Sequence, residues 1–215
     1  GCKSIKSMVF PESVKEIGNK VFRLCEELES VEMIGVVKVG DNAFDGCRLL
    51  ENVVYSEKLK EVGQGAFNSC KLSETLDLSS LTKIGAGAFS DTSVKKVILN
   101  DNLEKLEYGV FQGCTLLEEI NFPSKLVSIG DCCFRMTGIY KAVFSEGLKK
   151  IGALAFDSCE ELYILEFPES IEKIGNYAFE NTLLEIVVIP ENLKVIGYRA
   201  FGYCEELDIL YFNAK

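Results

Sequence analysis

The sequence predicts an α/β solenoid, a stack of similar units that each contribute short strands and a single helical turn. A phenylalanine recurs nine times at intervals of 22 or 23 residues, preceded by Ala in six units and by Val or Cys in the others. In eight units an Ile or Val followed by Gly lies just before it, and all four prolines share one phase. The recurring residues are Phe22, Phe44, Phe67, Phe89, Phe111, Phe134, Phe156, Phe179 and Phe201.

The first element of each unit is expected to be a short strand, as the unit that ends at Phe179 illustrates. Leu162 comes first, and Leu165 and Phe167 then alternate with outward residues, as the two-residue period of a strand requires. Pro168 lacks the N–H that a strand ladder uses, so we expect the strand to end there.

A second extended piece and a tight turn complete the unit. Ile171 and Ile174 belong to this piece, and Gly175 is expected to supply a turn with positive φ. Ala178 and Phe179 are then expected to face inward from a single turn of α-helix or 3-10 helix. One unit cannot bury its apolar side alone, whereas stacked units can.

One unit departs from the pattern at the glycine position. Glu107 stands where the other eight units have Gly, and a side chain at positive φ would cost roughly 1 kcal/mol. Gly109 could let the turn form differently. Drift and a tuned site are both open interpretations.

The repeat predicts a single domain over residues 1–215, with about nine units of 22–23 residues and a partial first unit, because no linker interrupts it. Residue 1 falls inside a unit, since Cys2 aligns with Cys25. We therefore expect a segment of a longer chain, whose targeting or anchoring elements lie elsewhere.

The composition excludes several classes of partner. A net charge of −10 disfavours nucleic acids and anionic membranes, which both require clustered Lys and Arg. The longest apolar stretch, residues 186–190, is far shorter than the roughly 20 residues of a membrane span. We expect no nucleic-acid partner and no membrane span in this segment.

Catalytic and metal sites are not expected. The chain has no histidine, which excludes Ser-His and Cys-His nucleophile pairs and His-ligated zinc. The glycine-rich stretches 63–67 and 85–93 do not complete a phosphate-binding motif and occupy the turn of the repeat. The acidic pairs at 26–27, 160–161 and 205–206 lack calcium-loop spacing and are read as a solvated rim. The prediction is a protein that is not an enzyme and holds no cofactor or metal.

Most of the nine cysteines occupy one position of the repeat, three residues after the phenylalanine. Thr92, Thr137 and Thr182 fill this position in other units, which favours a small, inward, free thiol. One or more disulfides between neighbouring units, or a metal, remain alternatives. The adjacent Cys132 and Cys133 are read as packing residues, with a redox pair as the alternative.

The unit consensus L-x-x-h-x-F-P-x-x-L-x-x-I-G-x-x-A-F-x-x-C-x-x-L, with h apolar, resembles the BspA-like leucine-rich repeats of bacterial surface proteins and some protists. The resemblance covers essentially the whole chain. It implies a curved, right-handed leucine-rich repeat stack with parallel strands on the concave side. It also implies a cell-surface or secreted location and a role in adhesion or recognition.

The outward strand positions hold the information that the repeat does not use. They are mostly polar in the first half of the chain and apolar near its end. A contiguous apolar patch at that end predicts contact with a partner. β-branched residues also favour strands when exposed, and further repeats could cover this end, so a structural explanation remains open. The predicted binding residues are Tyr163, Ile164, Glu166, Ile186, Val188, Ile209 and Tyr211.

Two functions follow from these observations. The first is a non-catalytic protein-binding or adhesion module that engages a host, neighbouring-cell or matrix protein. The second is a structural spacer that holds another domain away from its anchor.

Overall fold

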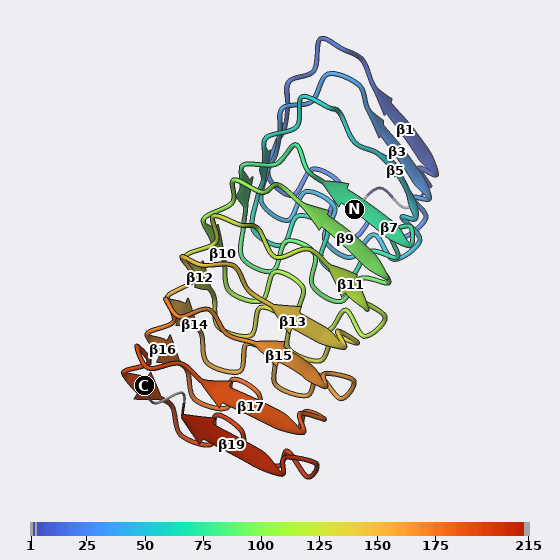
Figure 1. The fold of residues 1–215 in the computed structure, drawn as a ribbon. Helices are drawn as coiled ribbons and strands as arrows, with labels where there is room; N and C mark the ends of the chain where they lie inside the picture. The colour runs from blue at the N-terminus through green and yellow to red at the C-terminus, as the bar shows by residue number, and fades with distance from the viewer. Residues whose placement is uncertain (1, 3, 213–215) are drawn as a thin grey trace.

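The structure is a computed structural model that describes residue 2 and residues 4–212. It is a parallel β-solenoid with one coil for each repeated phenylalanine, and the coils stack from the N-terminal to the C-terminal end (Figure 1). Odd-numbered strands line one side and even-numbered strands another. Every pairing between described strands is parallel.

The odd-numbered strands match the predicted first element of each unit. They are β1 (Ser7–Phe10), β3 (Ser30–Met33), β5 (Asn52–Val54), β7 (Thr75–Leu78), β9 (Lys96–Leu99), β11 (Glu119–Ile120), β13 (Lys141–Val143), β15 (Ile164–Glu166), β17 (Ile186–Ile189) and β19 (Ile209–Phe212). Their ladder is divided into the groups β1-β3-β5, β7-β9-β11, β13-β15 and β17-β19.

The even-numbered strands match the predicted second extended piece. They are β2 (Glu16–Ile17), β4 (Lys38–Val39), β6 (Glu61–Val62), β8 (Lys83–Ile84), β10 (Lys105–Leu106), β12 (Ser128–Ile129), β14 (Lys150–Ile151), β16 (Lys173–Ile174) and β18 (Val195–Ile196). They form two sheets, β2-β4-β6-β8 and β10-β12-β14-β16-β18.

The helical turn expected around each phenylalanine is wrong, because the described residues form no helix there and make consecutive turns instead. Tyr177 and Asn181, on either side of Phe179, have φ of 58° and 55°. The N–H groups of Tyr177, Phe179 and Asn181 donate to carbonyl oxygens of the next unit, at N–O distances of 2.9, 2.8 and 3.0 Å respectively. A left-handed conformation costs about 1–2 kcal/mol per residue, and these inter-unit hydrogen bonds offset it.

The prediction that the repeated glycine is needed for a positive φ is also wrong. Gly175 does not have positive φ. A Cβ at this position would lie 2.5 Å from the backbone N of Ala153 and 2.5 Å from the carbonyl carbon of Gly152. The glycine is therefore required because the backbone of the preceding unit approaches closely.

Glu107 marks a division in the even-strand sheet. In other units the residue at this repeat position is Gly, and a Cβ there would lie too close to the backbone of the preceding unit. Among the described strands, no pairing joins β8 to β10. The predicted strain at positive φ is wrong, since Gly109 has φ of 58° and Glu107 is not among the residues with positive φ. The interruption is confined to this ladder, since the N–H of Phe89 still donates to the carbonyl oxygen of Val110 in the next coil at 3.0 Å.

The repeated phenylalanines form the centre of the core. From Phe22 to Phe201 each ring stacks on the next, with centroids 5.1–5.9 Å apart. Seven of these side chains are fully buried. The core is therefore a continuous aromatic column, which neighbouring units complete for one another.

The cysteine column lies beside this core as a hydrogen-bonded ladder of free thiols. The thiols of five cysteines donate to the carbonyl oxygen of the phenylalanine in the preceding unit. Their Sγ–O distances are 3.1 Å for Cys47, 3.2 Å for Cys70, 3.1 Å for Cys114, 3.0 Å for Cys159 and 3.1 Å for Cys204. The hydroxyl groups of Thr92, Thr137 and Thr182 lie 3.1–3.3 Å from the next sulfur, which explains why Thr replaces Cys here.

We expect most of these thiols to be unreactive in the folded protein at pH 8. Burial raises the pKa of Cys47 to about 12 and that of Cys114 to about 11, so little reactive thiolate forms. In a titration with an aromatic disulfide reagent that releases a coloured thiolate, exposed Cys2 and half-buried Cys204 should react first. All 9 cysteines should react after denaturation without reductant.

A shortfall in denaturant would reveal disulfides and contradict this prediction. Rapid reaction of the buried column in the native protein would contradict it as well. Cys47→Thr, which copies the residue at position 92, should remove one slow thiol while the circular dichroism spectrum stays unchanged.

Candidate binding surface

The strand register confirms that the predicted outward positions form columns. Ile186 lies opposite Ile209, and Val188 lies opposite Tyr211. On the neighbouring pair of strands, Lys141 and Val143 lie opposite Ile164 and Glu166. We call the surface formed by these side chains the odd-strand face.

The predicted binding residues lie on three strands at the C-terminal end of the odd-strand face. Ile186 is 50% exposed and Tyr211 is 49% exposed. Val188 and Ile209 are also exposed, as is Glu166, whereas Ile164 is half-buried. β15 and β17 are neighbours without ladder pairing, so Tyr163, Ile164 and Glu166 belong to a separate sheet group. Whether these seven residues bind a partner stays a prediction.

An aromatic pair extends this surface toward the middle of the chain. The Tyr140 and Tyr163 rings stack with centroids 6.1 Å apart, and both are exposed. Both residues stand immediately before an odd-numbered strand. Sequence reasoning missed Tyr140, although its spacing of 23 residues from Tyr163 was available as a signal.

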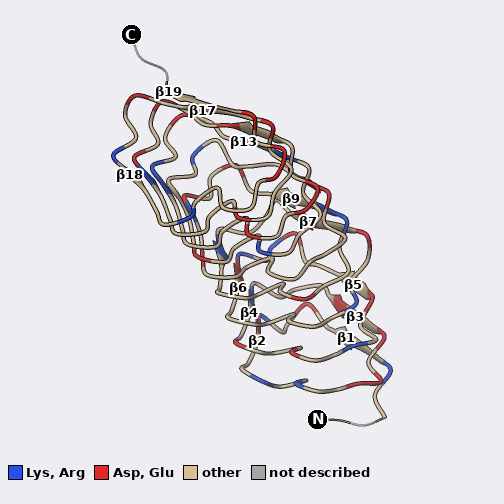
Figure 2. Ribbon diagram, turned by 90° about the horizontal axis from the view of Figure 1, so that it is seen from below, with Lys and Arg blue, Asp and Glu red and all other residues tan. Residues whose placement is uncertain are grey.

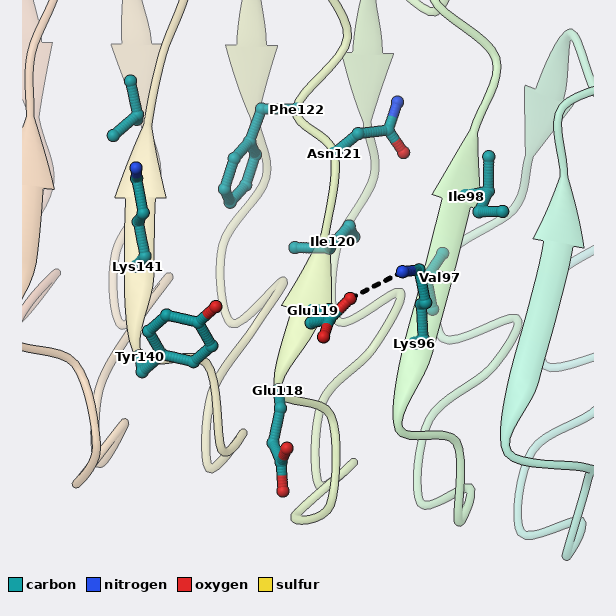
Figure 3. Close-up of a pocket in the computed structure, with 11 residues that line it drawn as sticks. Lys96, Val97, Ile98, Glu118, Glu119, Ile120, Asn121, Phe122, Tyr140 and Lys141 are labelled. Carbon is teal, nitrogen blue, oxygen red and sulfur yellow. Dashed lines mark hydrogen bonds and ion pairs between the residues drawn. The ribbon is translucent and has the colours of Figure 1, made fainter.

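A hollow of about 430 Å³ lies beside Tyr140, where the ladder between β11 and β13 is interrupted (Figure 3). Asn121 accounts for the early end of β11. Its side chain accepts from the N–H of Leu99 at 2.7 Å and donates to the carbonyl oxygen of Leu99 at 3.1 Å. The amide side chain thus occupies the place of a ladder partner.

The floor of this hollow carries one ion pair. The ammonium of Lys96 lies 2.6 Å from a carboxylate oxygen of Glu119, as the dashed line in Figure 3 marks. The hydrogen bond to Glu119 raises the pKa of Lys96 above its usual value. The pair neutralises the surface at β9 and β11, so Lys96 is not a free cation.

We define the strand-start rim as the residues immediately before the odd-numbered strands. They are Lys6, Glu29, Glu51, Glu74, Lys95, Glu118, Tyr140, Tyr163, Glu185 and Asp208. In the first half of the stack each acid of this rim has a lysine partner: Glu29 with Lys6 at 3.6 Å, Glu51 with Lys71 at 2.8 Å and Glu74 with Lys95 at 2.6 Å. Among the described residues, neither Glu185 nor Asp208 forms an ion pair.

The odd-strand face is formed by exposed strand side chains. Within residues 2 and 4–212, no group of three His, Cys, Asp or Glu side chains could hold a metal ion. In the same part of the chain, no helix is long and apolar enough to cross a membrane. What remains is an exposed sheet face with aliphatic, aromatic and acidic side chains.

These features define a leucine-rich repeat solenoid, and the chain belongs to the family of BspA type leucine rich repeat regions. The family model matches residues 1–93 and 82–208, with 6 copies of the repeat. No curated protein matches the chain in sequence.

One solved structure shares the fold. The pneumococcal vaccine antigen PcpA has a TM-score of 0.58 and 21% identity, over 94% of this chain and 60% of that one. This chain therefore spans less than two thirds of the length of that antigen. A leucine rich cell surface protein from Faecalibacterium prausnitzii has a TM-score of 0.40 and 18% identity, over 100% of this chain and 61% of that one.

Proposed function

We propose that this chain is a non-catalytic protein-binding module, an adhesion segment of a cell-surface or secreted leucine-rich repeat protein. Its partner is a protein of a host or neighbouring cell, or of the surrounding matrix. The observation that carries this proposal is the row of apolar side chains that β17 and β19 place on the odd-strand face.

The exposed side chains of β17 and β19 support the proposal. Ile186, Val188, Ile209 and Tyr211 adjoin one another through the strand register and are all exposed. The equivalent positions on β7 carry the polar residues Thr75 and Asp77. Contiguous apolar surface of this kind marks interaction sites, and Tyr is enriched in protein interfaces.

The fold relative also supports an accessible location. PcpA is described as a pneumococcal vaccine antigen, and this description supports the cell-surface or secreted location in our proposal. The stacked core, in which each unit contacts only its neighbours, suits an extended and regular display surface. The same regularity would serve the alternative, a structural spacer, and the experiment below separates the two.

The proposal is tested by replacing two apolar residues of the patch with acids. The purified chain and its Ile186→Asp/Val188→Asp variant are immobilised and exposed to a panel of purified extracellular-matrix proteins. We expect the variant to lose at least about tenfold in affinity for any protein that the wild-type chain binds, because a carboxylate within an apolar contact must be desolvated.

The matched control is Asn52→Asp/Val54→Asp, which places acids at the two equivalent positions of β5. This variant should bind as the wild-type chain does. Equal binding by all three proteins would refute the proposed surface. If the folded wild-type chain binds no protein of the panel, the structural-spacer function is favoured.

A further inference from the structure

We propose that the C-terminal half of the odd-strand face binds a positively charged, amphipathic protein segment. This inference rests on the proposed function and adds the chemistry of the partner. Two features support it: the distribution of ion pairs around the apolar patch, and the aromatic pair beside the patch.

The strand-start acids before β17 and β19, Glu185 and Asp208, lack the lysine partners that Glu29, Glu51 and Glu74 have in the first half of the stack. Four further exposed acids lie in the loops before β15 and β19, namely Glu160, Glu161, Glu205 and Glu206. Among the described residues none of the six forms an ion pair. At the equivalent rim position of β5, Glu51 pairs with Lys71 at 2.8 Å. The stack thus neutralises the rim in its first half and leaves it negative in its second.

The strands that carry the patch contain few charges of either sign. In β13, β15, β17 and β19 the charged residues are Lys141 and Glu166. Lys141 lies at the edge nearest the middle of the chain, on β13. Beyond Glu166, therefore, β17 and β19 carry no charged residue, and the rim positions before them are the acids Glu185 and Asp208.

Charge separation across the whole stack agrees with this local pattern. In Figure 2 acidic segments recur along the side that carries β13, β17 and β19, whereas basic segments gather beside β18. Lys194 near β18 is paired with Glu172 at 2.7 Å. A partner approaching the odd-strand face from solvent therefore meets negative charge that is not internally compensated.

Tyr140 and Tyr163 offer a second type of contact for the same partner. Their stacked rings are exposed beside the patch. A Lys or Arg side chain placed over an aromatic ring is attracted by the negative face of the ring. The hollow between β11 and β13 adjoins Tyr140, and its lining includes Glu118 and Lys141. An anionic partner would gain none of these contacts and would be repelled by the rim.

The test uses three labelled synthetic peptides of about ten residues, longer than the roughly 15 Å spanned from β13 to β19. One alternates Lys and Ile, one replaces Lys by Glu, and one replaces Ile by Ser. Fluorescence anisotropy titrations with the 215-residue chain at low salt should show binding of the first peptide, with affinity at least about tenfold higher than for the other two. Raising the salt concentration should remove most of the advantage over the Glu peptide.

Two sets of substitutions locate the binding. Neutralisation of four unpaired acids by Glu160→Gln, Glu161→Gln, Glu185→Gln and Asp208→Asn should weaken the Lys-Ile peptide at least about tenfold. The matched control is Glu26→Gln, Glu27→Gln, Glu51→Gln and Glu74→Gln, which removes the same charges at equivalent repeat positions. It should leave the affinity within about twofold.

A further variant removes apolar area without changing charge. Ile186→Thr/Val188→Thr should also weaken the Lys-Ile peptide, because both the acidic rim and the apolar centre contribute. Equal binding of the three peptides, or equal losses in the two neutralised variants, would overturn the inference. A matrix protein that depends on the patch but not on the acids would overturn it while leaving the proposed function intact.

Discussion

Phe111→Ala is expected to lower the free energy of unfolding by about 3–5 kcal/mol, the cost of truncating a fully buried aromatic side chain. Phe111 has no exposed surface and stacks between Phe89 and Phe134, with centroids 5.9 and 5.7 Å away. Truncation leaves a cavity in the middle of the column, where neighbouring coils hold the backbone in place. Urea denaturation followed by circular dichroism measures the change.

Tyr108→Ala is the matched control for this truncation. Tyr108 is an aromatic residue of the same unit and is 55% exposed, so its removal should cost less than about 1 kcal/mol. If Phe111→Ala left the unfolding midpoint where it is in the wild-type chain, the phenylalanine column would not be the core of this fold. Because repeat stacks can unfold in segments, the loss should also appear as an earlier or broader transition.

Gly175→Ala is expected to destabilise the chain by about 3 kcal/mol, although it adds a single methyl group. The new Cβ would lie 2.5 Å from two backbone atoms of residues 152 and 153, and backbone cannot move aside as a flexible side chain can. The coils that contain β14 and β16 would have to separate, with loss of the bond from the Gly175 N–H to the carbonyl oxygen of Ile151, now 2.9 Å. Thermal and urea unfolding would measure the cost.

Glu107→Ala tests whether the cost comes from close stacking or from the loss of glycine itself. This residue stands in the same column, but its coil is not paired with the preceding one through β8 and β10. A Cβ already exists there, and the substitution removes only an exposed ion pair with Lys105 at 3.0 Å. We expect a change within about 0.5 kcal/mol. Similar losses at both positions would show that the close approach is not the reason for the glycine.

The repetition of the sequence was sufficient to predict the stack, the two extended pieces and the outward columns. Periodic positions reveal which residues share an environment, and the register of Ile186 with Ile209 confirms this. The repetition did not reveal what that environment is. The turn around Phe179 was expected to be helical and Gly175 to have positive φ, and both expectations were wrong.

The physical reason for both errors is that the relevant contacts join different units. Tyr177 adopts a left-handed conformation because its N–H finds an acceptor in Tyr198 of the next coil. Gly175 is small because the preceding coil approaches it. Local propensity describes neither effect, since it treats each unit as if it were alone.

The candidate surface was predictable only in part for a similar reason. The exposure of Ile186 and Val188 follows from strand alternation. The hollow beside Tyr140 depends instead on Asn121, whose side chain binds the backbone of Leu99 and ends β11. The contrast between the neutral and the acidic rim depends on which lysine reaches which glutamate, and pairing across coils cannot be read from spacing alone.

The turns and the glycine positions orient their peptide groups in opposite directions along the stack. The N–H of Phe179 donates to Ala200 of the following coil, whereas the N–H of Gly175 donates to Ile151 of the preceding coil. In an α-helix all peptide dipoles add, so each end carries a partial charge. Here the two rows oppose each other, so these peptide groups do not build up opposite partial charges at the ends as coils are added.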